Sequence, residues 1–410
     1  MSTPPVAERT DARLPASMRL LGVDAARGLA LIGMMSVHIL PRLDDDGTAS
    51  TAYLIASGRS AALFAVLAGV GLALASGGPT PPRGRPLAGA VVATLARALV
   101  LLLVGLVLGS FDSGVAVILA YYAIFFAATA PFLGLTARVL LPLAGAWAVL
   151  GPVLSQAIRP TLPPSSFGNP TMESLARPVD LLREIMVTGY YPVLTWMAYL
   201  LAGLGIGRLA LRETRTARNI LLGGAVLAAT AWVTSWLLVH QGGGLERLEA
   251  AGAAGTPIAG RPLEVALTTS FFGTTPTSSW WWLAVVAPHS GSPFDMLHTI
   301  GTAGVVLGSM LLLAKVARAA IWPLAAIGSM TLTLYTTHVV LLSTVLPRET
   351  PDALLWHVVV AAAIAVPWRA FVGRGPLEAV AAQFSAAARS AVVPSGPRAL
   401  EPPGRSPTRH

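Results

Sequence analysis

The chain has 410 residues, of which 54% are hydrophobic and only 11% are charged, whereas soluble domains have about 25% charged residues. This composition excludes an ordinary soluble protein and indicates a polytopic membrane protein. The chain has no cysteine, which excludes disulfides, zinc–thiolate sites, iron–sulfur clusters and a cysteine nucleophile. The formal net charge is +9, but its distribution indicates membrane topology, so we expect no nucleic-acid partner.

Ten apolar segments follow one another along the chain, each about 20 residues long and therefore able to cross a bilayer. They cover residues 20–40, 59–76, 88–109, 115–135, 138–157, 190–207, 219–239, 293–313, 321–343 and 353–371. The first has charges and no clear cleavage site, which favours a retained span over a signal peptide. We therefore predict an all-α protein with about ten transmembrane helices, whose partner is the lipid bilayer.

The segment 240–291 does not fit this pattern. It begins rich in glycine and mixed in charge, then becomes aromatic, with Trp280, Trp281 and Trp282 in a row. Tryptophan concentrates at membrane interfaces, so we predict an interfacial or re-entrant piece. An eleventh span within 262–288 is the alternative.

Basic residues are concentrated in every second loop between the predicted spans. The loops after the second, fourth, sixth and eighth spans contain Arg83, Arg85, Arg138, Arg208, Arg212, Arg215, Arg218, Lys315 and Arg318. Because cytoplasmic loops have an excess of arginine and lysine, we predict that both ends of the chain are cytoplasmic. The transmembrane domain covers residues 19–374, and the tails 1–18 and 381–410 are expected to be disordered.

The first predicted span carries three ionisable residues, Asp24, Arg27 and His38. Asp or Arg at the centre of a span costs about 2.5–3.5 kcal/mol, so such groups usually pair or line a cavity. The helical repeat places all three on one face, and the rise from Arg27 to His38 is roughly 16 Å. The face therefore presents Asp24 and Arg27 near the cytoplasm and His38 near the outer side. A purely structural Asp24–Arg27 pair is the alternative.

Topology places further polar residues at the outer depth of His38. These residues are Arg59, His289, Ser290, His298 and His338. Together with Tyr122, which lies deeper in the fourth span, they form the predicted substrate-binding set. Singly, each has a structural explanation, such as an interfacial histidine, but together they favour a polar cavity that opens outwards. Asp295, His298 and His289 do not match an established zinc spacing, so we predict no metal.

Several motifs occur in order along the chain. Residues 19–38 have the pattern R…D-x-x-R-G…H, and further motifs follow at 58–60 (GRS), 118–123 (ILAYYA), 288–291 (PHSG), 328–338 and 375–378 (GPLE). Together they resemble the heparan-alpha-glucosaminide N-acetyltransferase-like and YeiB-like membrane proteins. The half 19–157 carries the first-span signature, and the half 190–380 resembles the bacterial YeiB-like branch.

This resemblance implies a multi-pass transmembrane acyltransferase of the bacterial plasma membrane. Relatives take acetyl from cytosolic acetyl-CoA and place it on a glucosamine amine across the membrane, and their active-site histidine matches His38. The long outer domains of the heparan enzyme are missing here, so we do not transfer its substrate. The expected acceptor is an amine or hydroxyl of a cell-envelope sugar or glycolipid.

The resulting hypothesis is an acyl-CoA-dependent acyltransferase with His38 as the general base. Acetyl-CoA or another acyl-CoA would bind as the donor at Asp24, Arg27, Arg83 and Arg85, with Arg97 as a further phosphate contact. One alternative is a transporter or flippase for a small anionic or glycan-linked solute. The sequence argues against it, because we find no internal repeat and no paired broken helices. Another is a non-catalytic protein with this fold. The oligomeric state stays open.

Overall fold

The computed structural model of the protein describes residues 20–252, 262–269 and 271–393. Within these residues the chain is helical and has no β-sheet. The tail 1–18 lies outside the described residues, as does 394–410. Residues 381–392, which we expected to be disordered, instead form the greater part of the last helix.

The predicted spans correspond closely to helices. The first half of the chain contains α1 (Leu21–Ile39), α2 (Thr51–Ala56), α3 (Arg59–Ala75), α4 (Gly84–Gly109), α5 (Leu119–Thr129) and α6 (Ala137–Ile158). The second half contains α7 (Pro178–Arg183), a π-helical turn at Glu184–Thr188, α8 (Val193–Gly207), α9 (Thr214–Trp236), α10 (Gly244–Ala250), α11 (Leu263–Thr268), α12 (Pro293–Val316), α13 (Arg318–Gly328), α14 (Thr331–Ser343), α15 (Ala353–Phe371) and α16 (Pro376–Val392).

Six of the described helices are long and apolar enough to cross a membrane, and there are up to eight such spans if two bent helix pairs each count as one. The first bent pair joins α7 and its π-helical extension to α8, and the second joins α13 to α14. Their bends of 59° and 65° correct our expectation that the chain lacks paired broken helices. The protein is therefore a multi-pass membrane protein, although the helix α1, with its ionisable residues, and the short apolar α5 are not among these spans.

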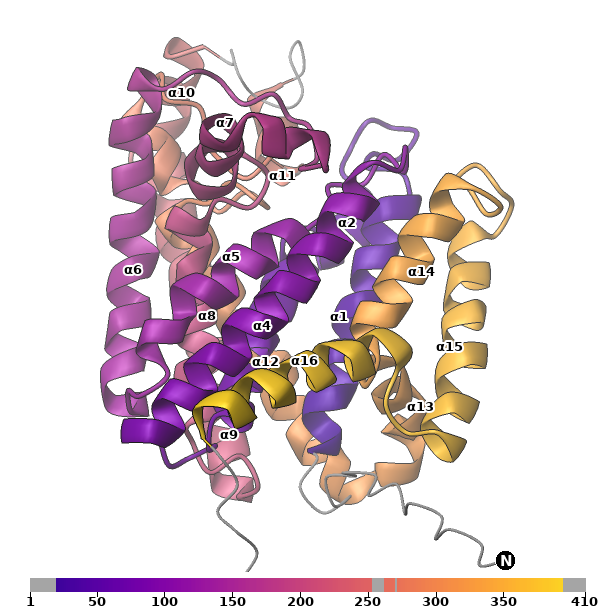
Figure 1. The fold of residues 1–410 in the computed structure, drawn as a ribbon. Helices are drawn as coiled ribbons and strands as arrows, with labels where there is room; N and C mark the ends of the chain where they lie inside the picture. The colour runs from indigo at the N-terminus through magenta and orange to yellow at the C-terminus, as the bar shows by residue number, and fades with distance from the viewer. Residues whose placement is uncertain (1–19, 253–261, 270, 394–410) are drawn as a thin grey trace, which may run out of the picture.

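The end of the molecule drawn at the top of Figure 1, called the upper end below, collects the chain's irregular segments. There α1 ends, α14 and α15 are joined by a loop, and the short helices α7, α10 and α11 lie above the long ones. The described residues between 240 and 291 form two short helices and a 3-10 turn, with no helix long enough to span. They pack around a small separate core that includes Leu248, Phe271 and Trp282.

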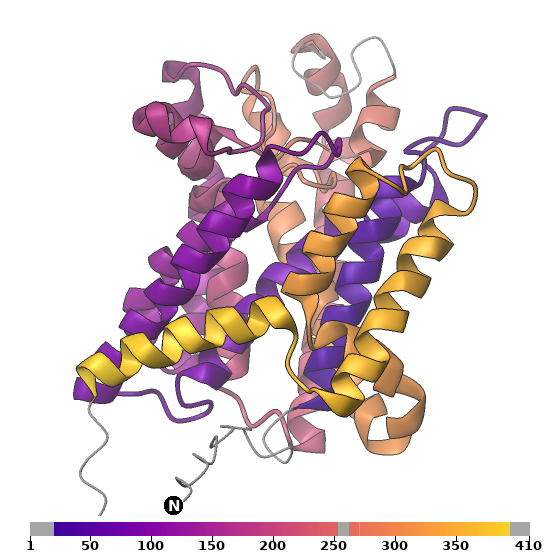
Figure 2. The same cartoon turned by 45° about the vertical axis from the view of Figure 1, so that its right-hand side comes forward.

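At the opposite, lower end, α16 lies across α4 instead of continuing the bundle (Figure 2). The helices between these ends pack closely where side chains are small. A β-carbon at Gly28 would collide with the backbone carbonyl of Leu324, and one at Gly328 would collide with that of Asp24. These two glycines let α1 and α13 approach to backbone contact, as small residues do in membrane bundles.

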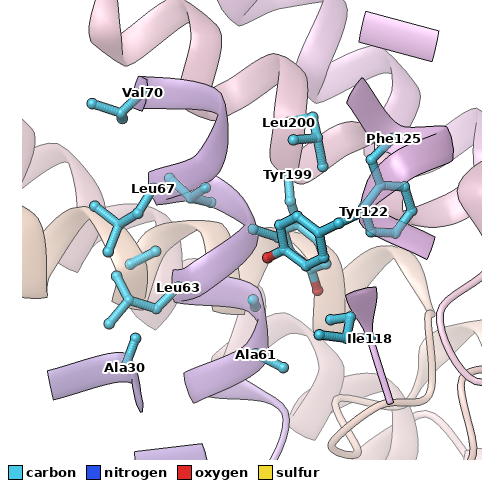
Figure 3. Packing of buried hydrophobic residues seen from close by; sticks show 14 of the residues in the cluster. Ala30, Ala61, Leu63, Leu67, Val70, Ile118, Tyr122, Phe125, Tyr199 and Leu200 are labelled. Carbon is cyan, nitrogen blue, oxygen red and sulfur yellow. The ribbon is translucent and has the colours of Figure 1, made fainter. Parts of the chain in front are cut away.

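The main core lies where α3, α5 and α8 meet (Figure 3). Leu63 and Leu67 lie on the side of α3 away from Tyr122 and Phe125 of α5, and Leu200 of α8 lies on the same side as the two aromatic rings. All five side chains are buried. This core separates the polar groups at the upper end of α1 from those at its lower end.

Candidate active site

A row of three histidines from three helices lies at the upper end. His38 Nδ1 is 3.0 Å from His338 Nε2, and His338 Nδ1 is 3.0 Å from His357 Nδ1. The outer nitrogen of the last ring, His357 Nε2, lies 3.0 Å from the backbone carbonyl oxygen of Leu346. These are ordinary hydrogen-bond distances. Residues 38, 338 and 357 are far apart in sequence, so only tertiary packing joins them.

The three histidines occupy different places on their helices: His38 lies in the last turn of α1, His338 in the middle of α14 and His357 near the start of α15. His38 lies in the last turn of α1, before Pro41 prevents the helix from continuing. α14 starts anew after the bend at Ser329, and the Glu378 carboxylate accepts hydrogen bonds from the backbone N–H groups of Leu332 and Thr333 at its first turn. Glu378 thus holds the helix that carries His338.

The three rings differ in accessibility. His338 and His357 are only 1% and 2% exposed, whereas His38 is half-buried. Both ring nitrogens of His338 are also used within the row. Within the row, His38 is therefore the residue able to meet a substrate, and His338, expected to contact substrate, stands behind it.

Arg59 and His298 form a second polar pair at the same end. Arg59 Nε donates to His298 Nε2 at 3.4 Å, and His298 Nδ1 lies 3.1 Å from the carbonyl oxygen of Ala228. The carbonyl can only accept, so His298 carries its proton on Nδ1 and presents a lone pair to Arg59. A second guanidinium nitrogen, Arg59 Nη1, donates to the backbone carbonyl of Leu54, which leaves Arg59 Nη2 for other contacts.

His289 and Ser290 lie in the loop before α12. The His289 ring stacks on Trp196 with 6.0 Å between ring centroids, and burial lowers its pKa to about 4, with a smaller effect from the charge of Arg42. Its backbone has a left-handed φ of 54°, which is uncommon outside glycine. Ser290 is buried and its hydroxyl accepts from the backbone of Ser292. His289 and Arg348 both lie close enough to act electrostatically on His38.

An open pocket of about 390 Å³ lies at the upper end, and none of the three histidines is among its lining residues. Its lining includes Asp112, Gly114, Val115, Phe167, Asn169 and Tyr190. Val115 packs against Ile39, the neighbour of His38, and Arg348 donates to the carbonyl of Ser113 at 3.1 Å. The pocket lies within the 300–1,000 Å³ range of small-molecule sites and combines aromatic with polar groups, as such sites do.

Tyr122 belongs to the interior, away from these polar groups. It is buried between the rings of Phe64, Phe125 and Phe126. Its hydroxyl has no hydrogen-bond partner in the part of the chain that the structure describes. The positive charge of Arg27 acts on it. Tyr122 therefore stands between the upper site and the lower basic groups.

The lower polar groups form a network around Asp24. Its carboxylate lies 3.6 Å from Arg27 and 3.9 Å from Arg369, and Arg27 also donates to the carbonyl of Leu67 at 3.3 Å. Arg97, halfway along α4, feels the charges of Arg27 and Arg374. Among the described residues, no group of three or more histidine, cysteine or acidic side chains is arranged to hold a metal.

The four predicted donor-binding residues do not lie together. Arg83 and Arg85 are exposed at the start of α4, and the helical rise puts Arg85 roughly 18 Å before Arg97. The structure instead brings Arg97 towards Arg27.

Sequence reasoning missed His357, Arg369 and Arg374. His357 had a usable signal, because it lies one turn inside the start of the tenth predicted span and hence at the same depth as His38 and His338. Arg369 lies in the last turn of that span and Arg374 just beyond it, where interfacial arginines are common. Their proximity to Asp24 and Arg97 depends on how α15 and α16 return to α1.

The fold and this site define a multi-pass membrane protein with a histidine centre at one end and basic groups at the other. The family model described as "Heparan-alpha-glucosaminide N-acetyltransferase, catalytic" matches residues 19–240. The match covers more than half of the chain, which therefore belongs to this family, and the family's catalytic domain indicates an acetyltransferase-type function. Acetyltransferases of this type use acetyl-CoA as the donor. No curated protein matches the chain.

The matched region contains α1 and His38, whereas α12 to α16 lie beyond it. His338 and His357 are therefore outside the matched segment. The family assignment does not reach the YeiB-like branch.

Proposed function

We propose that this protein transfers an acyl group from acyl-CoA on the cytoplasmic side to an amine or hydroxyl of a cell-envelope sugar or glycolipid on the outer side. The carrying observation is that His38 is half-buried at the upper end of α1, within the matched family segment and hydrogen-bonded to His338. A neutral histidine at this position suits a general base, because its unprotonated ring nitrogen can take the proton of the acceptor.

The donor path of this proposal begins at the lower end. Arg83 and Arg85 would meet the phosphates of acyl-CoA at the exposed start of α4, and Arg97 and Arg27 would hold them further inside. Arginine suits phosphate because its planar guanidinium makes paired hydrogen bonds. Support comes from the exposed side chain of Arg97 in the middle of a membrane helix, since an arginine there usually faces a water-filled cavity.

The reaction at the upper end conserves atoms and protons. The acceptor nitrogen or oxygen forms a bond to the acyl carbon while His38 removes its proton, and the bond from that carbon to the CoA sulfur breaks. CoA leaves as a thiolate and takes up a proton from the cytoplasmic side. Arg59 is our candidate for stabilising the developing oxyanion, because its Nε and Nη1 are bonded to His298 and Leu54 while Nη2 is left to donate. Direct transfer of the acyl group is simpler than a route through an acyl-histidine intermediate.

The topology that goes with this function has about ten passes in a bacterial plasma membrane, with both ends cytoplasmic. Adding α1 and α5 to the eight candidate spans yields ten passes. The bundle supports α1 as a pass despite its charges, because Asp24 is buried and paired with Arg27 and Arg369. The upper end is then the outer end.

His38→Ala tests the catalytic assignment. In purified protein with radiolabelled acetyl-CoA and a panel of amino sugars and hydroxyl sugars, we expect turnover to fall on the order of 10²- to 10⁴-fold, the usual contribution of a general base. His240→Ala is the matched control, since His240 is an exposed histidine on another helix. Undiminished turnover in His38→Ala contradicts the general-base role.

A transporter or flippase is a second candidate, because the described residues contain two bent helix pairs. Broken helices often form the substrate site of transporters. Vesicles containing the protein would separate the two functions. Solute uptake without acetyl-CoA turnover favours transport, whereas acetyl transfer across the vesicle membrane favours the enzyme.

A further inference from the structure

The hydrogen bonds of the histidine row determine where each proton sits. The Leu346 carbonyl oxygen can only accept, so His357 Nε2 must carry a proton and donate it. In a neutral ring the other nitrogen then has the lone pair, so His357 Nδ1 accepts from His338 Nδ1. The same step places a lone pair on His338 Nε2, which accepts from His38 Nδ1. His38 is left with an unprotonated Nε2.

Burial prevents water from changing which ring nitrogens carry protons. His338 and His357 are 1% and 2% exposed, so water does not replace their ring partners. A buried hydrogen-bonding group without a partner costs about 1–3 kcal/mol, which opposes any tautomer that places two lone pairs or two protons face to face. The His38 and His338 rings are nearly parallel, at 13°, with centroids 5.3 Å apart.

We propose that His338 and His357 are positioning residues that hold His38 in the tautomer with Nε2 unprotonated. When His38 takes up a proton, they also transfer the resulting positive charge along the row towards the exposed loop after α14. This inference rests on the proposed function and deepens it. It assigns roles to two residues outside the matched family segment. The Leu346 carbonyl is the fixed end of the row, comparable to the acidic residue that orients the histidine of a catalytic triad.

The proton steps balance along the row. His38 Nε2 takes the acceptor's proton, and its Nδ1 proton moves to His338 Nε2. The Nδ1 proton of His338 then moves to His357 Nδ1, which makes His357 a cation whose Nε2 proton stays in the hydrogen bond to Leu346. His38 and His338 each gain one proton and lose one, His357 gains one, and the reverse transfers return the charge to His38, whose Nε2 then releases the proton.

The charged groups around His38 favour moving its positive charge along the row. Arg348 and His289 act on His38 from the loop after α14 and from the loop before α12. Arg348 is cationic, so a positive charge confined to His38 is repelled. Spreading the charge over three rings moves it to His357, whose outer nitrogen meets a carbonyl dipole of favourable sign.

The tautomers can be read directly in the protein without any substrate. Two-bond proton–nitrogen correlation spectra of protein labelled with nitrogen-15 in its histidine rings distinguish protonated from unprotonated ring nitrogens. Loss of signals in His38→Gln, His338→Gln and His357→Gln assigns the three rings among the seven histidines. We expect protons on Nδ1 of His38, Nδ1 of His338 and Nε2 of His357. A wild-type His38 protonated on Nε2 overturns the proposal.

Kinetics test whether this order matters for catalysis. We expect His357→Phe to lower kcat about 10²-fold while KM for both substrates stays unchanged, because His357 touches neither. His357→Gln should recover much of the rate, since its amide can both donate to Leu346 and accept from His338. His240→Phe, which alters an exposed histidine, should leave kcat unchanged. A normal kcat and pH–rate profile in His357→Phe contradicts the charge-sharing role.

The two proposals fail in different ways. Absence of acyl transfer by the wild type, with the expected tautomers in the spectra, removes the enzyme function and leaves the order of the row intact. Normal transfer by the wild type with a His38 protonated on Nε2 removes the row's role and leaves the enzyme. If His357→Phe does not fold, the wild-type spectra still decide.

Discussion

At the scale of single residues, tertiary contacts give different structural roles to residues that have the same type and similar neighbours in the sequence. Arg208, Arg212, Arg215 and Arg218 form one basic cluster, and all four fit a cytoplasmic loop. Only Arg208 among them is buried, at 4% exposure. Its guanidinium donates to the carbonyls of Ala73, Gly78 and Leu133, at 3.0, 2.7 and 2.6 Å. It therefore satisfies carbonyls at the end of α3 and at the turn before α6, which those helices cannot satisfy themselves.

Replacing Arg208 should destabilise the fold. In Arg208→Leu at least three buried carbonyls lose a donor, and each unsatisfied group costs about 1–3 kcal/mol, so we expect a loss of about 3 kcal/mol or more. Thermal or denaturant unfolding of the detergent-solubilised protein measures it. Arg218→Leu, which alters an exposed arginine of the same cluster, is the control and should unfold like the wild type. Equal stability of the two variants would show that the carbonyls find other donors.

At the scale of elements, the bend between α13 and α14 is the feature that shapes the site. The sequence predicts one span over 321–343, and within it the chain bends by 65° and begins a new helix at Thr331. The first turn of that helix has free N–H groups inside the bundle, and Glu378 of α16 accepts from two of them and from the Thr333 hydroxyl at 2.7 Å. The motif at 375–378 is explained by this cap.

Removing the cap should loosen α14 and displace His338. We expect Glu378→Ala to lose about 1–2 kcal/mol of stability, as for other lost N-caps, and to lower acyl transfer together with it. Gln383→Ala, on an exposed position of the same helix, is the control. Unfolding curves and turnover of both variants measure the effect. Full activity in Glu378→Ala would show that the Glu378 cap is not needed to position His338 for acyl transfer.

At the scale of the whole molecule, the arrangement places the histidine row and the basic groups at opposite ends of one bundle (Figure 1). The row lies where α1 ends, and Asp24 and Arg27 lie near where it begins. Such a separation suits a reaction whose donor and acceptor come from opposite sides of a membrane. It requires that the loop before α4 and the loop before α15 face different compartments.

The absence of cysteine from the chain makes this topology directly testable. Thr80→Cys labels the lower loop and Glu349→Cys the upper one, and both positions are exposed. In intact cells we expect a membrane-impermeant maleimide to react with Glu349→Cys alone, and with both variants after permeabilisation. Reaction of both in intact cells would place the two loops on one side and contradict the proposed number of passes between them.

The membrane character, the helical class and the approximate bounds of the long helices follow from the sequence, because apolar length and turn residues act locally. The depth of His38 and His338 also follows, since counting spans places both at one end. The row itself does not follow, because its 3.0 Å contacts depend on the bend before α14 and on the return of α15 beside α1.

The sequence by itself determined that this protein is a multi-pass membrane protein of the heparan-alpha-glucosaminide N-acetyltransferase family type, with His38 as its most informative residue. Hydrophobic length, loop charge and a short polar motif are enough for that, since each is read within about 20 residues. Only the tertiary structure decided which histidines touch, which arginine is buried and which acid caps α14. Hydrogen bonds are made over a few ångströms between residues that can be 300 positions apart or more, and no local pattern specifies them.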